Sequence, residues 1–501
     1  MLDDATPNLQ SRLQLGAVTD VDIAILGAGF AGMCMAIALQ RAGMHDFVIL
    51  ERADEVGGTW RDNHYPGAAC DVPSHLYSLS FAPKADWSRV YPTQPELLAY
   101  LCELADAHGL RPKIRFGHDL RGADYDAETG RWRLDTSRGV VVAKKVVSGT
   151  GSLSEPRAPT LPGLERFAGK TFHSATWDHE YPLAGKRVAV IGTGASAIQF
   201  VPEIAAAPAQ LDVYQRTPNW IIPRPDRAYG SIAQWIFRHV PGVRALYRAS
   251  IYWKQEGRVL GFVVHPSLMK IGQRSALRHI AAQIADPALR ARVTPEFAFG
   301  CKRVLISNDW YPMLQRDNVE LVTTPVAEIT TDAIIDDAGR RRPVDCIIHA
   351  TGFYASESPI AAKIRGKDGT SLAHTWRDGE QAYLGTLVHG FPNLFLIVGP
   401  NVGLGHNSMV FMIETQVAYI MRLLAHMRDR GADVLDVRAA VQQRFNDELQ
   451  TKLRGSIWAT GCKSWYQHRS GKITALWPGF TFDFWRRTRA FDASQYELGP
   501  S

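Results

Sequence analysis

The hydrophobic pattern of the chain contains two segments of the same design, an apolar strand followed by a glycine turn and a helix of small and apolar residues. The first is VDIAILGAGFAGMCMAIALQRAG, from Val21 to Gly43, and the second is KRVAVIGTGASAIQFVPEIA, from Lys186 to Ala205. Strands and helices alternate around both turns, which is typical of parallel sheets covered by helices. We therefore predict an α/β protein with two doubly wound, Rossmann-like domains.

The first segment carries the spacing GxGxxG at Gly27, Gly29 and Gly32. In this arrangement the first glycine permits a tight bend, the second lets a pyrophosphate approach the backbone, and the third lets the helix pack against the strand. The next strand, DFVILER, ends at Glu51, about twenty residues further on, where a carboxylate can accept hydrogen bonds from ribose hydroxyls. A membrane span over residues 23–39 would explain neither the glycines nor Glu51.

The second segment has the form GxGxxA, and its following strand ends in QRT instead of an acid. A guanidinium at this place can bind the 2′-phosphate of NADP, which a carboxylate would repel. The alternative is a solvated cation at the end of a strand. One turn followed by an acid and one by an arginine indicate FAD first and NADPH second, with hydride transfer into the flavin. The residues of the second site are Gly192, Gly194, Ala197, Arg216 and Thr217.

The pattern of apolar residues beyond the second glycine turn predicts further divisions of the chain. Apolar residues between 226 and 295 recur at helical spacing, which predicts a helical insert in the second domain. Its Arg and Lys residues could face anionic lipid and give weak membrane association; the alternative that we favour is a solvated face and a lid over the substrate. We predict an FAD domain that begins over residues 1–152, an NADP domain over 153–225 and 296–344, and a return to the FAD domain over 345–501.

Composition narrows the class of protein. The 501 residues are 46% hydrophobic with a net charge of +6 and no basic runs, which favours anionic small molecules over nucleic acid as partners. The six cysteines form no CxxC pair, so neither a metal site nor a disulfide scaffold is expected, and a reducing compartment fits best. The N-terminal sequence MLDDATPNLQSR lacks the apolar core of a signal peptide. These features predict a cytoplasmic enzyme without a transmembrane segment.

Three further motifs carry a family resemblance. FxGxxxHxxxW followed by Asp is found at Phe167, Gly169, His173, Trp177 and Asp178; GGTWRDNHYPGAACD covers 57–71; and GCKR covers 300–303. With these motifs the chain resembles the flavin-containing monooxygenases, and within them the single-chain Baeyer–Villiger monooxygenases that use FAD and NADPH. The resemblance extends from about residue 21 to the SWY at 464–466, which is most of the chain.

The resemblance implies a reaction and the residues for it. Reduced flavin and oxygen would form a C4a-peroxyflavin that inserts one oxygen atom beside a ketone carbonyl, giving an ester or lactone. Arg303 matches the active-site arginine, which would stabilise the peroxyanion and the developing charge on the ketone oxygen. Asp71 matches the carboxylate that orients this arginine. The other site residues that the resemblance implies are Thr59, Trp60, Tyr77, Lys302 and Trp465.

The resemblance implies that His173, in the FxGxxxHxxxW motif that links the two domains, affects domain positions more than bond chemistry. The alternatives are a hydrogen-bonded linker histidine at His173 and a packing residue at Trp177. Three other functions remain open: oxygenation of sulfur or nitrogen with the same cofactors, an NADPH reductase that does not oxygenate, and a cofactor-binding regulator without catalysis. Trp177 and Arg303 argue against the first, and Asp71 with Arg303 argues against the last.

Overall fold

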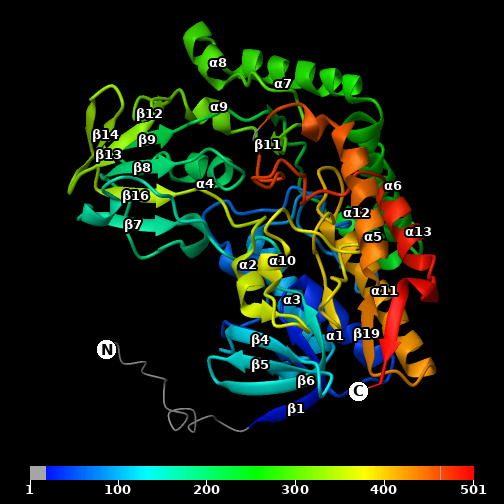
Figure 1. Cartoon of the computed structure of the whole chain (residues 1–501). Helices are drawn as coiled ribbons and strands as arrows, with labels where there is room; N and C mark the ends of the chain where they lie inside the picture. The colour runs from blue at the N-terminus through cyan, green and yellow to red at the C-terminus, as the bar shows by residue number, and fades with distance from the viewer. Residues whose placement is uncertain (1–17, 463, 501) are drawn as a thin grey trace, which may run out of the picture.

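The computed structural model describes residues 18–462 and 464–500, so the segment interpreted as lacking a signal peptide lies outside the described residues. Two sheets dominate the molecule, one at the bottom and one at the upper left in Figure 1. In the first sheet, β1 (Thr19–Leu26) pairs in parallel with β2 (Phe47–Leu50) on one side and β6 (Gly139–Ser148) on the other. The strand order of this sheet is β17 (Ile364–Arg365), β4 (Leu120–Asp126), β5 (Arg131–Thr136), β6, β1, β2 and β3 (Ile114–Arg115), and β18 (Leu394–Leu396) also pairs with β6.

The second sheet has five strands in the order β12-β9-β8-β16-β7, and all neighbours are parallel. Apolar residues occupy both faces of the central strands β8 and β16, as expected for a covered parallel sheet, whereas the edge strand β7 has the sequence KTFH. Strand β16 pairs with β8 in this sheet although it lies beyond residue 344, where the NADP domain predicted from the sequence ends. The strands are β7 (Lys170–His173), β8 (Arg187–Ile191), β9 (Gln210–Tyr214), β12 (Val319–Val322) and β16 (Cys346–His349).

The C-terminal third returns to the first sheet. Strand β18 (Leu394–Leu396) pairs with β6, and helix α11 (Met409–Asp429) packs on α1 (Phe30–Arg41). Their buried residues belong to one core, in which Met33 and Ile37 of α1 lie with Met412 and Ile420 of α11. The first nucleotide turn is therefore built from one end of the chain and covered by the other.

Helices fill the segment between β10 (Ile221–Ile222) and β11 (Leu305–Ile306), as the helical spacing predicts. None of the helices in residues 18–462 and 464–500 is both long and apolar enough to cross a lipid bilayer. The insert consists of α5 (Ser231–His239), α6 (Val243–Glu256), a π-helix (Leu260–Val264), α7 (Met269–Gln283) and α8 (Pro287–Val293).

The remaining elements complete the first sheet, form two smaller sheets, β13-β14-β15 and β19-β20, and cover the surface. They are α2 (Thr59–Asp62), α3 (Gln94–Ala107), β3 (Ile114–Arg115), β4 (Leu120–Asp126), β5 (Arg131–Thr136), α4 (Ala197–Ile204), α9 (Trp310–Met313), β13 (Val326–Ile329), β14 (Ala333–Asp336), β15 (Arg341–Pro343), β17 (Ile364–Arg365), α10 (Leu372–Thr375), β19 (Val434–Val437), α12 (Ala439–Arg454), α13 (Thr481–Arg489) and β20 (Tyr496–Gly499).

Candidate active site

The first glycine turn leaves no room for a side chain at Gly32 and has left-handed backbone geometry at Gly27. A Cβ placed on Gly32 would lie 1.9 Å from the carbonyl oxygen of Gly27, and Gly27 itself has a φ of 92°. Gly29 lies against Gly58 of the GGTW loop, where an added Cβ would come within 3.7 Å of the Gly58 Cα. Two bare stretches of backbone therefore meet at the N-terminus of α1, where a pyrophosphate can approach free N–H groups.

A cavity of about 290 Å³ opens beside this turn. It is lined by six of the residues predicted for the flavin site, and Met409 and Ile413 of α11 contribute to its wall. The Trp60 indole donates to the Tyr77 hydroxyl at 3.2 Å, and the two rings meet edge to face with centroids 5.6 Å apart. The six predicted residues are Gly27, Gly29, Glu51, Thr59, Trp60 and Tyr77.

Glu51 is buried and already bound by protein donors. Its Oε2 accepts from the Ala28 N–H at 2.8 Å, and its Oε1 accepts from the Arg61 guanidinium and the Ala53 N–H, both at 3.0 Å. Each carboxylate oxygen can accept more than one hydrogen bond, so contact with a ribose remains open. The carboxylate thus also holds the glycine turn, a role that the sequence pattern does not reveal.

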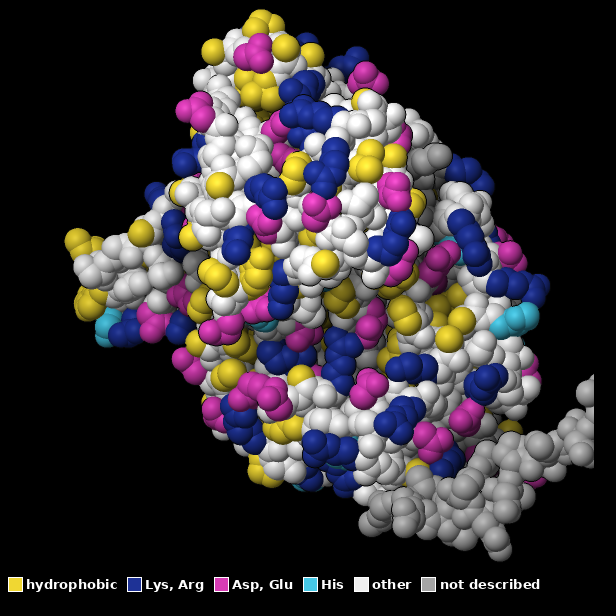
Figure 2. Space-filling view, turned by 90° about the vertical axis from the view of Figure 1, so that its left-hand side faces the viewer, with side chains coloured by type: hydrophobic (Ala, Val, Ile, Leu, Met, Phe, Trp, Pro, Cys, Tyr) yellow, Lys and Arg dark blue, Asp and Glu magenta, His cyan; other side chains and the backbone are white. Residues whose placement is uncertain are grey.

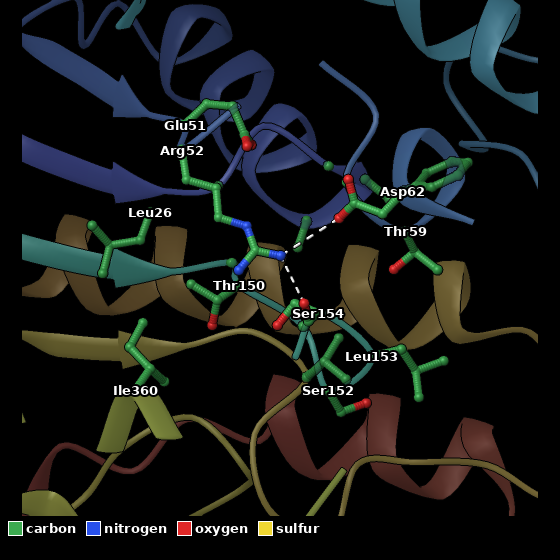
Figure 3. Close-up of a pocket in the computed structure, with 18 of the residues that line it drawn as sticks. Leu26, Glu51, Arg52, Thr59, Asp62, Thr150, Ser152, Leu153, Ser154 and Ile360 are labelled. Carbon is green, nitrogen blue, oxygen red and sulfur yellow. Dashed lines mark hydrogen bonds and ion pairs between the residues drawn. The ribbon is translucent and has the colours of Figure 1, made fainter. Parts of the chain in front are cut away.

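Arg52 is a site residue that the motifs miss. Its guanidinium crosses the cavity, donates to the Ser154 carbonyl at 2.7 Å and lies 3.6 Å from the Asp62 carboxylate (Figure 3). It also pairs with Glu155. The only sequence signal is its place directly after Glu51, at the end of β2.

The second glycine turn is more open. A Cβ on Gly192 would come within 2.5 Å of the Ala350 carbonyl, whereas a Cβ on Gly194 would meet nothing within 4 Å. Beyond β9, Arg216 is exposed and Thr217 half-buried. Lys302 lies over the Phe297 ring, 4.6 Å from its centroid, and its pKa is lowered by burial and by the charge of Arg216. The fold therefore places Arg216 and Lys302 near enough for the charge of Arg216 to act on the Lys302 ammonium.

The two catalytic candidates are in contact although 232 residues separate them. Arg303 donates from Nε to the Asp71 carboxylate at 3.1 Å and from Nη2 to the same oxygen. The Asp71 charge raises the pKa of Arg303 against the opposing effect of burial. The Arg303 side chain remains 39% exposed, so it is fixed by its partner and still accessible to a substrate.

Cys301 and Cys462 form one disulfide, although the cysteine spacing indicates no disulfide scaffold. Their separation of 161 residues explains the difference, because spacing reveals pairs only when they are close in sequence. The bond ties the loop of Arg303 to the segment before Trp465, whose ring is 43% exposed and 4.4 Å from that of Tyr466. Since disulfides persist mainly in oxidising compartments, the spacing of the cysteines no longer supports a reducing compartment.

The linker histidine and tryptophan have different surroundings. His173 ends β7, and its Nδ1 accepts from the Ala175 N–H at 3.1 Å while its ring lies edge-on to Phe353 at 5.7 Å. Phe353 belongs to the segment that leaves the second sheet after β16. Trp177 is buried between Phe172 and Phe200, with centroid distances of 5.3 and 5.0 Å. Trp177 is thus a packing residue, and His173 lies beside the crossing between the two sheets.

Two sheets whose glycine turns follow parallel strands, together with an arginine fixed by a carboxylate, define the class of flavoproteins with two dinucleotide-binding domains. Residues 24–244 match the family model described as pyridine nucleotide-disulphide oxidoreductase. A Baeyer–Villiger monooxygenase of Pseudomonas aeruginosa is 50% identical over 95% of this chain and 91% of its own length. One of Streptomyces coelicolor is 45% identical over 95% and 92% of the two chains.

The solved structure of OTEMO in complex with FAD and NADP superposes with a TM-score of 0.86 at 27% identity, covering 96% of this chain and 99% of that one. The chain belongs to the Baeyer–Villiger monooxygenase family. The predicted family, fold class and function as a flavoprotein monooxygenase that uses FAD and NADPH are confirmed at the level of the family, ahead of the sulfur- or nitrogen-oxygenating alternative.

Proposed function

We propose that this chain inserts oxygen next to a ketone carbonyl through Arg303 held by Asp71. The observation that carries the proposal is the fixed, accessible guanidinium. Arg303 has one carboxylate partner that orients it and leaves 39% of its side chain exposed. A cation in a defined orientation stabilises negative charge that develops on a carbonyl oxygen during attack.

The first site fits FAD and the second fits NADPH. Gly27, Gly29 and Gly32 leave backbone N–H groups accessible at the start of α1, and the adjoining cavity has an aromatic wall of Trp60 and Tyr77. Arg216 and Lys302 supply two cations for a 2′-phosphate. When bound, the flavin accepts hydride from NADPH and activates oxygen. The individual roles of the cofactor-binding residues are part of this proposal.

The residues of the chain have three tasks in the reaction. Arg303 holds positive charge at the reacting carbonyl, and the raised pKa keeps that charge throughout the working pH range. Asp71 keeps the guanidinium from turning away. Trp60, Met409 and Ile413 make one part of the cavity wall apolar, and burial of the flavin against this part would shield it from water.

Replacement of the arginine tests the proposal. Arg303→Ala should keep its flavin and its reduction by NADPH but form ester about 10²- to 10³-fold more slowly, because a preorganised charge is lost. Consumed oxygen should then appear as hydrogen peroxide. Arg303→Lys should restore part of the ester yield, and Arg187→Ala, which removes an exposed arginine of β8, is the matched control. Undiminished ester formation by Arg303→Ala would remove this residue from the role.

The substrate class is proposed more broadly than one compound. A panel of ketones, sulfides and amines, assayed for product per NADPH, separates ketone insertion from oxygenation of soft nucleophiles.

Cytoplasmic location stays a prediction, and the Cys301–Cys462 disulfide weighs against it since such bonds persist in oxidising compartments. Weak membrane association through the helical insert is also a proposal, and it rests on surface residues rather than on the reaction.

A further inference from the structure

Exposed apolar side chains gather on the helical insert. Of the sixteen large hydrophobic side chains that are exposed among the described residues, ten lie between residues 231 and 293. The exposed fractions reach 75% for Ile232, 73% for Leu246, 60% for Trp253 and 58% for Trp235. Concentrations of this kind mark surfaces for association, whereas single exposed apolar residues are ordinary.

Six of these side chains form what we call the apolar outer face. Each of three helices contributes two residues at helical spacing, so that each pair points to one side of its helix. The Trp253 and Phe482 rings lie 6.1 Å apart and connect α6 with α13, while α5 packs on α6 through Phe237 and Tyr247, whose rings are 5.1 Å apart on the inner side. All three helices lie on the right-hand side of Figure 1. The face consists of Ile232, Trp235, Leu246, Trp253, Phe482 and Trp485.

The same segment carries the positive charge of the protein. Residues 231–293 contain ten Lys and Arg residues and two acids, a net charge of +8, whereas the whole chain has +6. The two acids do not offset this charge at the outer face. Glu256 is buried and bound by Asn407 and Thr481, and Asp286 caps the N-terminus of α8. The remainder of the chain is therefore slightly acidic.

Helix α13 extends the basic character of the outer face. It carries Arg486, Arg487 and Arg489 against one acid, Asp483, and the Arg489 guanidinium lies over the Trp485 ring at 4.5 Å. Two more acids reach this region from other elements, since Asp86 pairs with Arg238 at 3.0 Å and Glu448 pairs with Arg487 at 2.7 Å. In contrast, Figure 2 shows acidic and basic side chains intermixed over the left-hand side of Figure 1.

We propose that the apolar outer face docks the enzyme on a membrane surface that contains anionic phospholipids. Tryptophan rings favour the boundary between water and lipid, and nearby Lys and Arg residues are attracted by anionic headgroups. The proposed contact is peripheral and is made at the bilayer surface by side chains of α5, α6 and α13. A second copy of the chain fits the face less well, because a two-fold interface would place two strongly basic segments against each other.

The inner side of the insert connects this face with the reaction site. Met269 and Phe262 pack so closely on Gly300 that a Cβ there would lie 2.3 and 3.2 Å from their side chains. Gly300 begins the GCKR loop that carries Arg303. The insert thus carries the apolar outer face on one side and contacts the start of the Arg303 loop on the other, which favours a lipophilic ketone as substrate. This last step rests on the proposed function, whereas the docking itself does not.

Vesicle flotation with the full-length, FAD-loaded enzyme tests the docking. The enzyme should float with vesicles of phosphatidylcholine and phosphatidylglycerol, bind pure phosphatidylcholine less, and dissociate as salt is added. Trp235→Glu with Trp253→Glu should weaken partitioning by at least about tenfold while flavin content and oxidation of a water-soluble ketone stay unchanged. Val18→Glu, at an exposed apolar residue outside the insert, is the matched control.

A second variant distinguishes loss of membrane binding from misfolding of the tryptophan variant. Lys254→Glu with Arg489→Glu leaves the apolar side chains in place and should lower binding to anionic vesicles only. Failure of the wild-type enzyme to bind anionic vesicles would overturn the proposal, and so would equal binding by the tryptophan variant. A dimer that dissociates in the tryptophan variant, without vesicle binding by either form, would make the face a subunit interface instead. Because flotation needs no turnover, these outcomes are independent of the reaction.

Discussion

The two glycine turns begin from nearly the same sequence pattern and become different sites. At the first turn, α1 is buried almost throughout, Gly32 has no room for a side chain, and Glu51 is held by three protein donors. At the second, Ala197 replaces the third glycine, Gly194 faces open space, and the strand ends in the exposed Arg216. The first turn is a rigid part of a core, and the second is an accessible surface.

This difference matches what the two cofactors must do. A flavin stays bound through every turnover, so its site can be completed by distant parts of the chain. A nicotinamide nucleotide must enter as NADPH and leave as NADP⁺, so its site has to remain reachable and to select by charge. Packing therefore dominates the first turn and electrostatics dominates the second, and substitutions should separate the two contributions.

The largest effect is expected at the third position of each turn. Gly32→Ala places a Cβ 1.9 Å from a backbone oxygen and should destabilise the fold by about 1–3 kcal/mol or more, with loss of flavin. Ala197→Gly, the reciprocal change, should leave the protein yellow and cost about 1 kcal/mol. Flavin content and thermal unfolding of both variants measure the contrast. Equal retention of flavin would show that the two turns are packed alike.

The next effect concerns the cation at the second turn. Arg216→Ala should weaken NADPH roughly tenfold to a hundredfold, the loss expected for hydrogen bonds between charged groups, and leave NADH nearly unchanged. Steady-state KM values for both nucleotides provide the measurement. Arg340→Ala, which removes an exposed arginine elsewhere, controls for general charge. Equal losses for NADPH and NADH would place the 2′-phosphate at other residues.

Glu51→Gln should have a smaller effect, and the effect should appear as a loss of stability instead of a change in nucleotide affinity. The amide keeps an acceptor for the Ala28 N–H but loses the charge that binds Arg61. If Glu51 holds the turn, the flavin-free protein should already be less stable by about 1–2 kcal/mol. Denaturant unfolding of the flavin-free form decides this. A loss confined to the flavin-bound form would instead assign Glu51 mainly to the ribose.

The smallest expected effect is a dependence of nucleotide choice on pH. Burial and Arg216 lower the pKa of Lys302, so this ammonium loses its charge at a lower pH than an ordinary lysine as pH rises. The preference for NADPH over NADH should therefore decline toward alkaline pH. Lys302→Arg should remove the decline, since a guanidinium stays charged. An unchanged slope in that variant would exclude Lys302 from phosphate binding.

The sequence predicts the parts of this molecule that depend on local spacing. Both glycine turns, the strand ends at Glu51 and Arg216, and the helical insert follow from patterns within about thirty residues. The family resemblance adds the contact of Arg303 with Asp71, which no local pattern contains. The structure adds what depends on distant partners: the Cys301–Cys462 bond, Arg52 in the cavity and the donors around Glu51.

The insert illustrates why the remainder could not be predicted. Helical periodicity identifies an apolar stripe but does not say which side faces the protein. Phe237 and Tyr247 occupy the inner side, and Trp235 and Trp253 are left outside. The sequence alone favours a solvated face and a lid over the substrate for this segment. The exposed tryptophans become visible only once neighbouring helices are placed.

The shared core of α1 and α11 determines when, during synthesis of the chain, the flavin can be bound. The glycine turn leaves the ribosome early, whereas Met409 and Ile413, which close the wall of the same cavity, emerge only when most of the chain has been made. A nascent chain can display the turn but cannot yet retain a flavin. Cofactor capture is therefore a late event in maturation, and a chain cut before α11 should be synthesised as a colourless protein.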